Sequence, residues 1–144
     1  MKISTKGRYA IRMLADLAQH GGDGYVSLKD VADRQGISKK YLEQIIPLFN
    51  RSDVLLTSRG FQGGYRLARK PEEYTLGEIL RLTEGSIAPV ACLEGEENHC
   101  PRRDACVTLP VWQGLYDAIR TYLDGVTLQD VLDQAAERGD YYII

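Results

Sequence analysis

The chain has 144 residues, of which 44% are hydrophobic, so it is long enough for one compact domain and too apolar for wholesale disorder. No apolar run approaches the length of a membrane span, and charged residues interrupt the N-terminal one, which argues against a signal peptide and for the cytoplasm. Residues 1–70 hold 13 basic and 6 acidic residues (+7), whereas residues 71–144 hold 5 and 14 (−9). This asymmetry predicts a nucleic-acid-binding module joined to something else, although a chance distribution of surface charge would look the same.

Two helices are predicted near the start of the chain. The first covers residues 5–20, whose apolar side chains recur at helical spacing. The second begins after the N-cap Ser27, and Asp30 three residues on predicts a capping box. Gly36 is the expected left-handed residue at the end of this second helix.

A third helix follows at once and completes a known motif. Ser38 is its N-cap, and Pro47 predicts a kink or an early end because proline cannot donate to the carbonyl of Glu43. Two short helices joined by a tight glycine turn form a helix-turn-helix. An ordinary helical hairpin shares that pattern.

A β-hairpin is predicted next. The stretches VLLTSR and YRLAR are strand-like, and the glycines of the intervening GFQGG permit the positive φ of a tight turn. A helix-turn-helix followed by a hairpin is a winged helix. No acidic residue occurs from Val54 to Lys70, and the wing carries Arg59, Arg66, Arg69 and Lys70. This bias predicts contact with a polyanion rather than a purely structural hairpin.

The second half predicts three helices and an irregular loop. Thr75 and Glu78 predict another capping box at the start of a helix. Residues 86–108 show no period and predict a loop. A long helix begins at Pro110, and one apolar stripe runs along it, formed by Trp112, Leu115, Tyr116, Ile119, Tyr122 and Leu123. Thr127 caps a last helix, and the tail DYYII has no clear pattern.

The second helix of a helix-turn-helix enters the major groove with its N-terminal residues on the base edges. The apolar residues of this helix face inward, which leaves the polar ones free to contact DNA: Ser38, Lys39, Lys40, Tyr41, Glu43 and Gln44. Lysine side chains can bind phosphates or guanine, Gln44 can pair with adenine, and Glu43 can accept a hydrogen bond from cytosine N4. An equal alternative is that Glu43 is only a solvated surface acid. Arg59 on the wing, with Gln62 beside it, is positioned to reach into a minor groove. Three cations near the start of the chain can bind the DNA backbone, namely Lys2, Lys6 and Arg8.

All three cysteines lie in CLEGEENHCPRRDAC, as Cys92, Cys100 and Cys106. In a reducing compartment such a cluster holds a metal more often than it forms a disulfide. Two alternatives remain: a zinc ion bound by three thiolates and a histidine, and thiols that bind no metal. The chain has only two histidines and no P-loop, GxGxxG or nucleophile elbow, so the sequence argues against an enzyme.

These features together resemble the IscR, NsrR and CymR family of bacterial winged-helix transcription regulators. The matching stretches are MKISTKGRYAIRML, SLKDVADRQGISKKYLEQI, SRGFQGGYRL, TLGEILRLTEG and TLQDVL. The resemblance implies a mainly α fold with a small β wing, and a repressor that binds a palindromic operator as a homodimer. It divides the chain into a winged helix-turn-helix over 1–84, a sensor loop over 85–108, and a dimerisation helix plus a last helix over 109–144.

In the IscR and NsrR branches, three cysteines of this loop hold a [2Fe–2S] cluster with one further ligand, so the resemblance implies that role for Cys92, Cys100 and Cys106. The spacing C-x7-C-x5-C is longer between the first two cysteines than in the best-known members. Leu109 and Arg8 stand where relatives place the fourth ligand, which leaves the candidates His99, Glu94, Glu96, Glu97 and Asp104.

The CymR branch is the alternative within the same resemblance. That branch has no cluster, and the stretch EGSIAPV before Cys92 looks like it. The chain would then be a cluster-free regulator of cysteine or sulfur metabolism that acts through an effector or a partner enzyme.

Overall fold

The computed structural model describes residues 2–50 and 52–139, and the DYYII tail, whose conformation the sequence left open, lies outside this part. The fold is mainly helical with one two-stranded antiparallel sheet, as predicted. In chain order the helices and strands are α1 (Thr5–His20), α2 (Leu28–Gln35), α3 (Lys39–Ile45), β1 (Leu55–Ser58), β2 (Gly64–Leu67), α4 (Leu76–Glu84), α5 (Leu109–Gly125) and α6 (Leu128–Glu137). Short 3₁₀ turns occur at Ile46–Phe49, Pro71–Glu73 and Ala91–Leu93.

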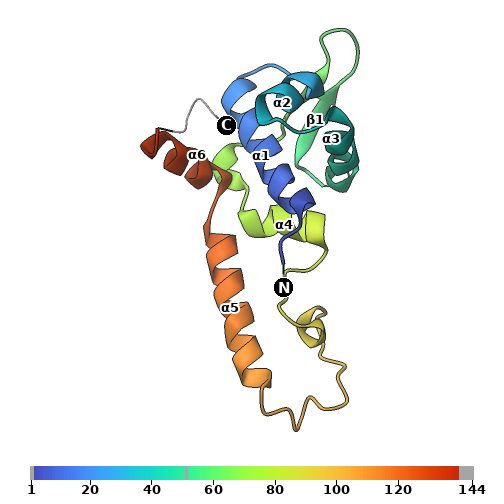
Figure 1. Cartoon of the computed structure of the whole chain (residues 1–144), viewed down its shortest axis with the longest axis vertical. Helices are drawn as coiled ribbons and strands as arrows, with labels where there is room; N and C mark the ends of the chain where they lie inside the picture. Colours follow the sequence, from blue (N-terminus) through green and yellow to red (C-terminus); the bar gives the residue numbers. More distant parts are fainter. Residues whose placement is uncertain (1, 51, 140–144) are drawn as a thin grey trace.

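Helix α1 lies at the centre of a helical body, with α2, α3 and the wing at one end and α4 across the other (Figure 1). Ala10, Met13 and Leu14 of α1 are fully buried. Buried side chains from the surrounding elements pack on them, including Leu42, Ile45, Phe49, Val54, Tyr74, Ile79 and Leu128. Each such side chain contributes about 1.5–3 kcal/mol relative to exposure. One core therefore joins the helix-turn-helix, the wing, α4 and α6.

Every α-helix except α5 begins at a serine or threonine whose side chain accepts a backbone N–H. At Thr127 the capping box is complete, because the acid three residues on accepts the Thr127 N–H at 2.9 Å. The capping boxes predicted at Ser27 and Thr75 are only half formed. Each hydroxyl accepts the backbone N–H three residues on at 3.1 Å, but the acidic side chain there accepts no hydrogen bond from the N-cap N–H. At Thr75 the cause is competition, since the Glu78 carboxylate accepts from Arg69 Nη2 at 2.5 Å instead.

Pro47 ends the regular part of the third helix, as predicted. Helix α3 stops at Ile45, and the chain continues as the 3₁₀ turn Ile46–Phe49. Proline has no N–H to donate to the carbonyl of Glu43, so the α-helical ladder cannot continue through it. Both ends of the turn are buried, which keeps the apolar face of α3 continuous with the core.

The starts of α4 and α6 are joined by an antiparallel bridge. The Leu76 N–H donates to the Val126 carbonyl at 2.9 Å, and the Leu128 N–H donates to the Tyr74 carbonyl at 2.9 Å. This bridge holds both helices on the body. Helix α5, which ends just before it, leaves the body as a long arm (Figure 1).

An ion pair attaches the C-terminal end of α5 to α4. Arg81 Nη1 and Nη2 donate to the two oxygens of Asp124 at 2.7 and 2.9 Å. A side chain at Gly77 would come within 1.9 Å of Asp124 Oδ1, so it would displace this carboxylate from its present position. Across residues 2–50 and 52–139, no helix combines the length and the apolar character needed to cross a membrane.

The predicted apolar stripe of α5 divides into two parts. Tyr116, Ile119 and Leu123 pack on Leu80 and Ile87 of the same chain. Other apolar side chains of the helix remain exposed, namely Val111, Leu115 and Tyr122. One edge of the stripe is therefore internal core, and the other is free for a partner.

Candidate nucleic-acid interface and cysteine loop

A buried ionic network fixes α1 against α2. The Asp16 side chain has no exposed surface and accepts from Arg34 Nε at 3.0 Å, from Arg34 Nη2 at 2.7 Å and from Gln35 Nε2 at 2.9 Å. The hydrogen bond that Arg34 donates to the Asp16 carboxylate raises the pKa of Arg34. Arg12 of α1 donates to both the side chain and the carbonyl of Gln35, at the end of α2. The sequence analysis missed this network, although an acid on the inward face of α1 was its visible signal.

The polar side chains predicted to contact DNA lie along the exposed face of α3. Leu42 and Ile45 are buried, while Lys39, Lys40 and Gln44 are exposed, as is Glu43. The inward and outward residues thus alternate as the helical period requires. Ser38 is occupied locally, because its hydroxyl accepts the Tyr41 N–H at 3.1 Å as the N-cap.

Tyr41 orients α3 on α1 as well as facing solvent. Its half-buried ring meets Tyr9 of α1 edge-on, with centroids 5.4 Å apart and an interplanar angle of 73°. The Arg12 guanidinium lies 5.2 Å from the Tyr9 centroid. Such contacts contribute about 0.5–1.5 kcal/mol each, so Tyr41 has a positioning role that the sequence analysis did not assign.

Glu43 is not an isolated acid. Its carboxylate lies 4.0 Å from Lys39 Nζ, one helical turn earlier, and both side chains are more than half exposed. An exposed pair of this kind contributes only about 0.3–0.5 kcal/mol. Glu43 is therefore free to exchange Lys39 for another hydrogen-bond donor.

The wing is a short hairpin tied to the body on one side. Its register pairs Leu55 with Leu67 and Ser58 with Gly64. Val26 adds a third backbone segment, because Val26 and Tyr65 exchange N–H···O bonds of 2.9 and 2.8 Å. Arg59 and Gln62 lie exposed in the loop that joins the two strands.

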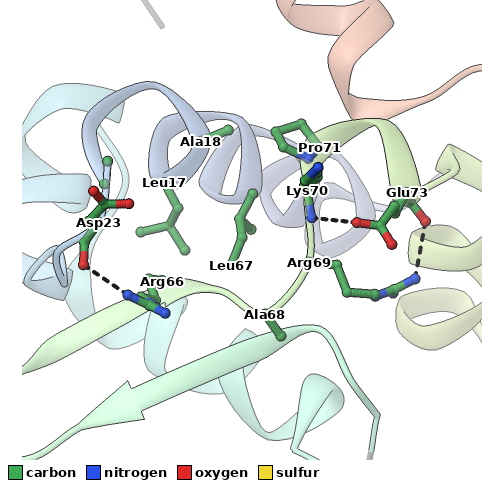
Figure 2. A pocket seen from close by; sticks show the side chains of 12 residues that line it. Leu17, Ala18, Asp23, Arg66, Leu67, Ala68, Arg69, Lys70, Pro71 and Glu73 are labelled. Carbon is green, nitrogen blue, oxygen red and sulfur yellow. Dashed lines mark hydrogen bonds between the residues drawn. The ribbon is translucent and has the colours of Figure 1, made fainter.

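At the base of the wing, two of its arginines form hydrogen bonds within the protein. Arg66 Nη1 donates to the Asp23 carbonyl at 2.8 Å. Arg69 donates to the carbonyls of Asp53 and Glu73 at 2.9 and 3.1 Å, besides its bond to the Glu78 carboxylate. Figure 2 shows the bonds of Arg66 to Asp23 and of Arg69 to Glu73 around a pocket of about 520 Å³, which lies between the end of α1 and the end of β2 with the residues after it.

The three cations predicted to hold the DNA backbone lie at the start of α1. Lys2 and Arg8 are exposed and Lys6 is half-buried. This end of the helix is anchored to α4, because Ser4 N and Oγ donate to Glu84 Oε1 at 3.1 and 2.6 Å. The Tyr9–Tyr41 contact described above brings the next turn of α1 beside the start of α3.

The cysteine loop between α4 and α5 is irregular, as predicted, apart from the 3₁₀ turn Ala91–Leu93. Cys92, Cys100 and Cys106 are half-buried thiols, none of which forms a disulfide. In the part of the chain that the structure describes, no three His, Cys, Asp or Glu side chains gather closely enough to hold a metal ion. The donor types suit a thiolate-bound cluster, but this arrangement of the loop does not bring them together.

Cys106 has the most reactive surroundings that the structure defines in this loop. Its sulfur lies 3.4 Å from the Thr108 hydroxyl, just before α5. The hydrogen bond from that hydroxyl is the main cause that lowers the pKa of the thiol from 9.0, with support from backbone N–H groups and Arg102. Cys100 is placed differently, because its N–H donates to the Asn98 side chain at 2.9 Å.

Comparison with known proteins agrees with this geometry. The profile of the Rrf2 family, described as "Iron-dependent Transcriptional regulator", matches residues 3–134. The chain is 40% identical over 136 residues to protein rrf2 of Nitratidesulfovibrio vulgaris, covering 94% of this chain and 90% of the relative. It resembles the structure of T. potens IscR (TM-score 0.75, 40% identity, 96% and 90% of the chains). It equally resembles that of CymR, the global cysteine regulator of B. subtilis (TM-score 0.75, 37% identity, 93% and 98%).

Proposed function

Because this chain belongs to the Rrf2 family of transcription regulators, and is a DNA-binding regulator rather than an enzyme, we propose that it represses transcription as a homodimer on a palindromic operator. One observation carries the proposal: the exposed polar face of α3 lies beside a wing with no acidic residue from Val54 to Lys70. Lys39 and Lys40 would neutralise phosphates, while Glu43 and Gln44 would read base edges.

The free edge of α5 supports the homodimer. Val111, Leu115 and Tyr122 are 61%, 44% and 66% exposed on a helix that projects from the body (Figure 1). Covering apolar area stabilises association by roughly 25 cal/mol per Å². A second copy offers the same stripe, and a two-fold pair presents two recognition helices to two half-sites.

The cysteine loop is the proposed sensor, and a [2Fe–2S] cluster on Cys92, Cys100 and Cys106 is the first candidate for what it holds. Three thiols within one loop are a suitable donor set, and the family description is iron-dependent. Binding would require the loop to rearrange around the cluster, because its cysteines are not gathered. The fourth ligand would come from the loop acids or His99, since Leu109 and Arg8 carry no suitable donor.

A cluster-free regulator of sulfur metabolism is the second candidate. The similarity to the cysteine regulator CymR is as strong in fold as the similarity to IscR. In that case Cys106 would act through its own thiol chemistry, or the acidic half would dock a partner enzyme.

The DNA-binding proposal is tested by charge removal on α3. Lys39→Ala and Lys40→Ala are expected to weaken binding to a duplex selected by the wild-type protein, and to reduce the slope of log K against log salt by about one each. Arg102→Ala is the matched control, since it removes one exposed charge from the cysteine loop. Unchanged slopes in both lysine variants would contradict the docking of α3.

The sensor proposal is tested by purification without oxygen, followed by visible absorption and by iron and sulfide assays. A coloured protein that contains iron and sulfide, and loses both in Cys100→Ser, supports the cluster. A protein that stays colourless after attempted reconstitution and still binds its duplex would support the cluster-free alternative. Zinc in place of iron would replace the cluster with a closed tetrahedral site.

A further inference from the structure

Phe61 is an aromatic side chain with no internal role. It is 103% exposed, more than any other large hydrophobic residue among those that the structure describes, where Val107 follows at 91%. Phe61 is placed at the tip of the wing, between the exposed Arg59 and Gln62. Because the ring covers no part of the core, its contribution to folding is negligible, and its whole surface is available to a partner.

The wing holds this ring outward in a tight turn. The strands end at the pair Ser58–Gly64, and within the loop the Gly63 N–H donates to the Gly60 carbonyl at 3.0 Å. Gly60 has φ +105°, and a side chain at Gly63 would come within 2.3 Å of the Ser58 carbonyl. These glycines permit the tight turn at whose tip Phe61 is exposed.

The surroundings of Phe61 suit a polyanion. The wing has no acidic residue from Val54 to Lys70, and the Arg59 guanidinium is exposed two residues from the ring. The wing also lies close to the end of α3, because a groove of about 460 Å³ separates it from the 3₁₀ turn that follows this helix, lined by Ile46, Asn50, Thr57 and Arg59 among others. A duplex bound by α3 would therefore lie within reach of the wing.

We propose that Phe61 is an apolar wedge that enters the minor groove beside the α3 contact and partly unstacks one base step. The inference rests on the proposed DNA binding and adds a source of sequence choice to it. Side chains such as phenylalanine unstack base steps from the minor groove, and pyrimidine–purine steps yield most easily. Phe61 would thus select deformable steps where no hydrogen bond reads a base, while Arg59 binds the groove beside it.

The test uses a duplex selected by the wild-type protein from random DNA, with 2-aminopurine placed in turn at each flanking step. Wild-type protein is expected to raise the fluorescence at one step of each half-site, and Phe61→Ala to abolish the rise and weaken binding roughly 10- to 100-fold. Phe61→Leu should retain part of both effects, because leucine is also a wedge. Val107→Ala is the matched control, since it removes an exposed apolar side chain from the cysteine loop and not from the wing.

The outcomes separate this inference from the proposed function. The wedge is contradicted if Phe61→Ala binds as tightly as the wild type and neither protein raises the fluorescence at any step. That result would leave the proposed DNA binding intact. Failure of the wild-type protein to select any duplex overturns both. Unchanged thermal unfolding of Phe61→Ala is expected, since the ring makes no core contact, so a loss of binding cannot come from misfolding.

Discussion

Asp16 is a carboxylate inside an otherwise apolar helix face, and its surroundings explain why it is tolerated there. Three donated hydrogen bonds from Arg34 and Gln35 satisfy its two oxygens, and Arg34 supplies the opposite charge. Burial of an unpaired carboxylate would be strongly unfavourable. The network therefore makes the packing of α2 on α1 specific, and α3 inherits that position.

Arg34→Ala is expected to lower the free energy of unfolding by about 2 kcal/mol, because it leaves Asp16 buried with only the Gln35 amide as partner. Urea denaturation at fixed protein concentration measures the change. Lys29→Ala is the control, since it breaks an exposed pair with Asp33 on the same helix and should change stability little. Equal effects of the two variants would show that the Asp16 network contributes nothing beyond a surface pair.

Cys106 offers a pH-dependent prediction at the scale of one hydrogen bond. The Thr108 hydroxyl lowers the pKa of the thiol from 9.0, so the reactive thiolate forms at a lower pH than it would alone. In Thr108→Val the alkylation of Cys106 should therefore shift to higher pH in the metal-free protein. Mass spectrometry of iodoacetamide-treated protein across a pH series measures it. A superimposable pH profile would assign no role to Thr108.

Charge bias in the sequence identified the basic wing but not the use of each residue. Arg66 and Arg69 bind backbone carbonyls, whereas Arg59 remains exposed. An arginine that anchors a loop and one that binds a phosphate look the same in a sequence. Their partners here are up to 43 positions away, so only the folded chain distinguishes them.

At the scale of elements, the ion pair of Arg81 and Asp124 couples the arm α5 to α4. It is the one bidentate contact that the described residues show between these helices, and Gly77 makes room for it. A shift of α5 in response to the cysteine loop would therefore act on α4, whose last residue, Glu84, accepts hydrogen bonds from Ser4 at the start of α1.

Asp124→Asn tests this contact through its pH dependence. The hydrogen bond from Arg81 lowers the pKa of Asp124 from 3.8, so the stabilisation is present above that pH and is lost as pH falls below it. Since the pair is partly exposed, the variant should lower Tm by only about 2 °C near neutral pH. The difference from wild type should shrink at about pH 3. A difference that is independent of pH would exclude the ion pair as its cause.

The ends of single helices could be predicted from the sequence, whereas the contacts between distant segments could not. The caps at Ser27, Ser38 and Thr127 and the stop at Pro47 depend on neighbours within four residues, and all are present. The bridge that pairs Thr75 with Thr127 joins residues 52 positions apart, so no local pattern reveals it. The apolar stripe of α5 was found, but its division between core and free surface depends on where α4 packs.

At the scale of the whole molecule, three features have to act together. Helix α3 and the wing lie at the same end of the body, the arm α5 offers the free apolar edge, and the cysteine loop connects α4 to that arm (Figure 1). Two-fold pairing through α5 would fix the separation of the two recognition helices. A change in the loop could then alter that separation without touching the DNA-binding face itself.

The most direct test of this account is to select duplexes from random DNA with the purified chain and to measure the mass of the resulting complex. The account predicts a two-fold symmetric consensus whose half-sites lie one helical turn or a multiple apart, with two chains bound per duplex. Enrichment of a single asymmetric site bound by one chain, or no enrichment at all, would contradict it.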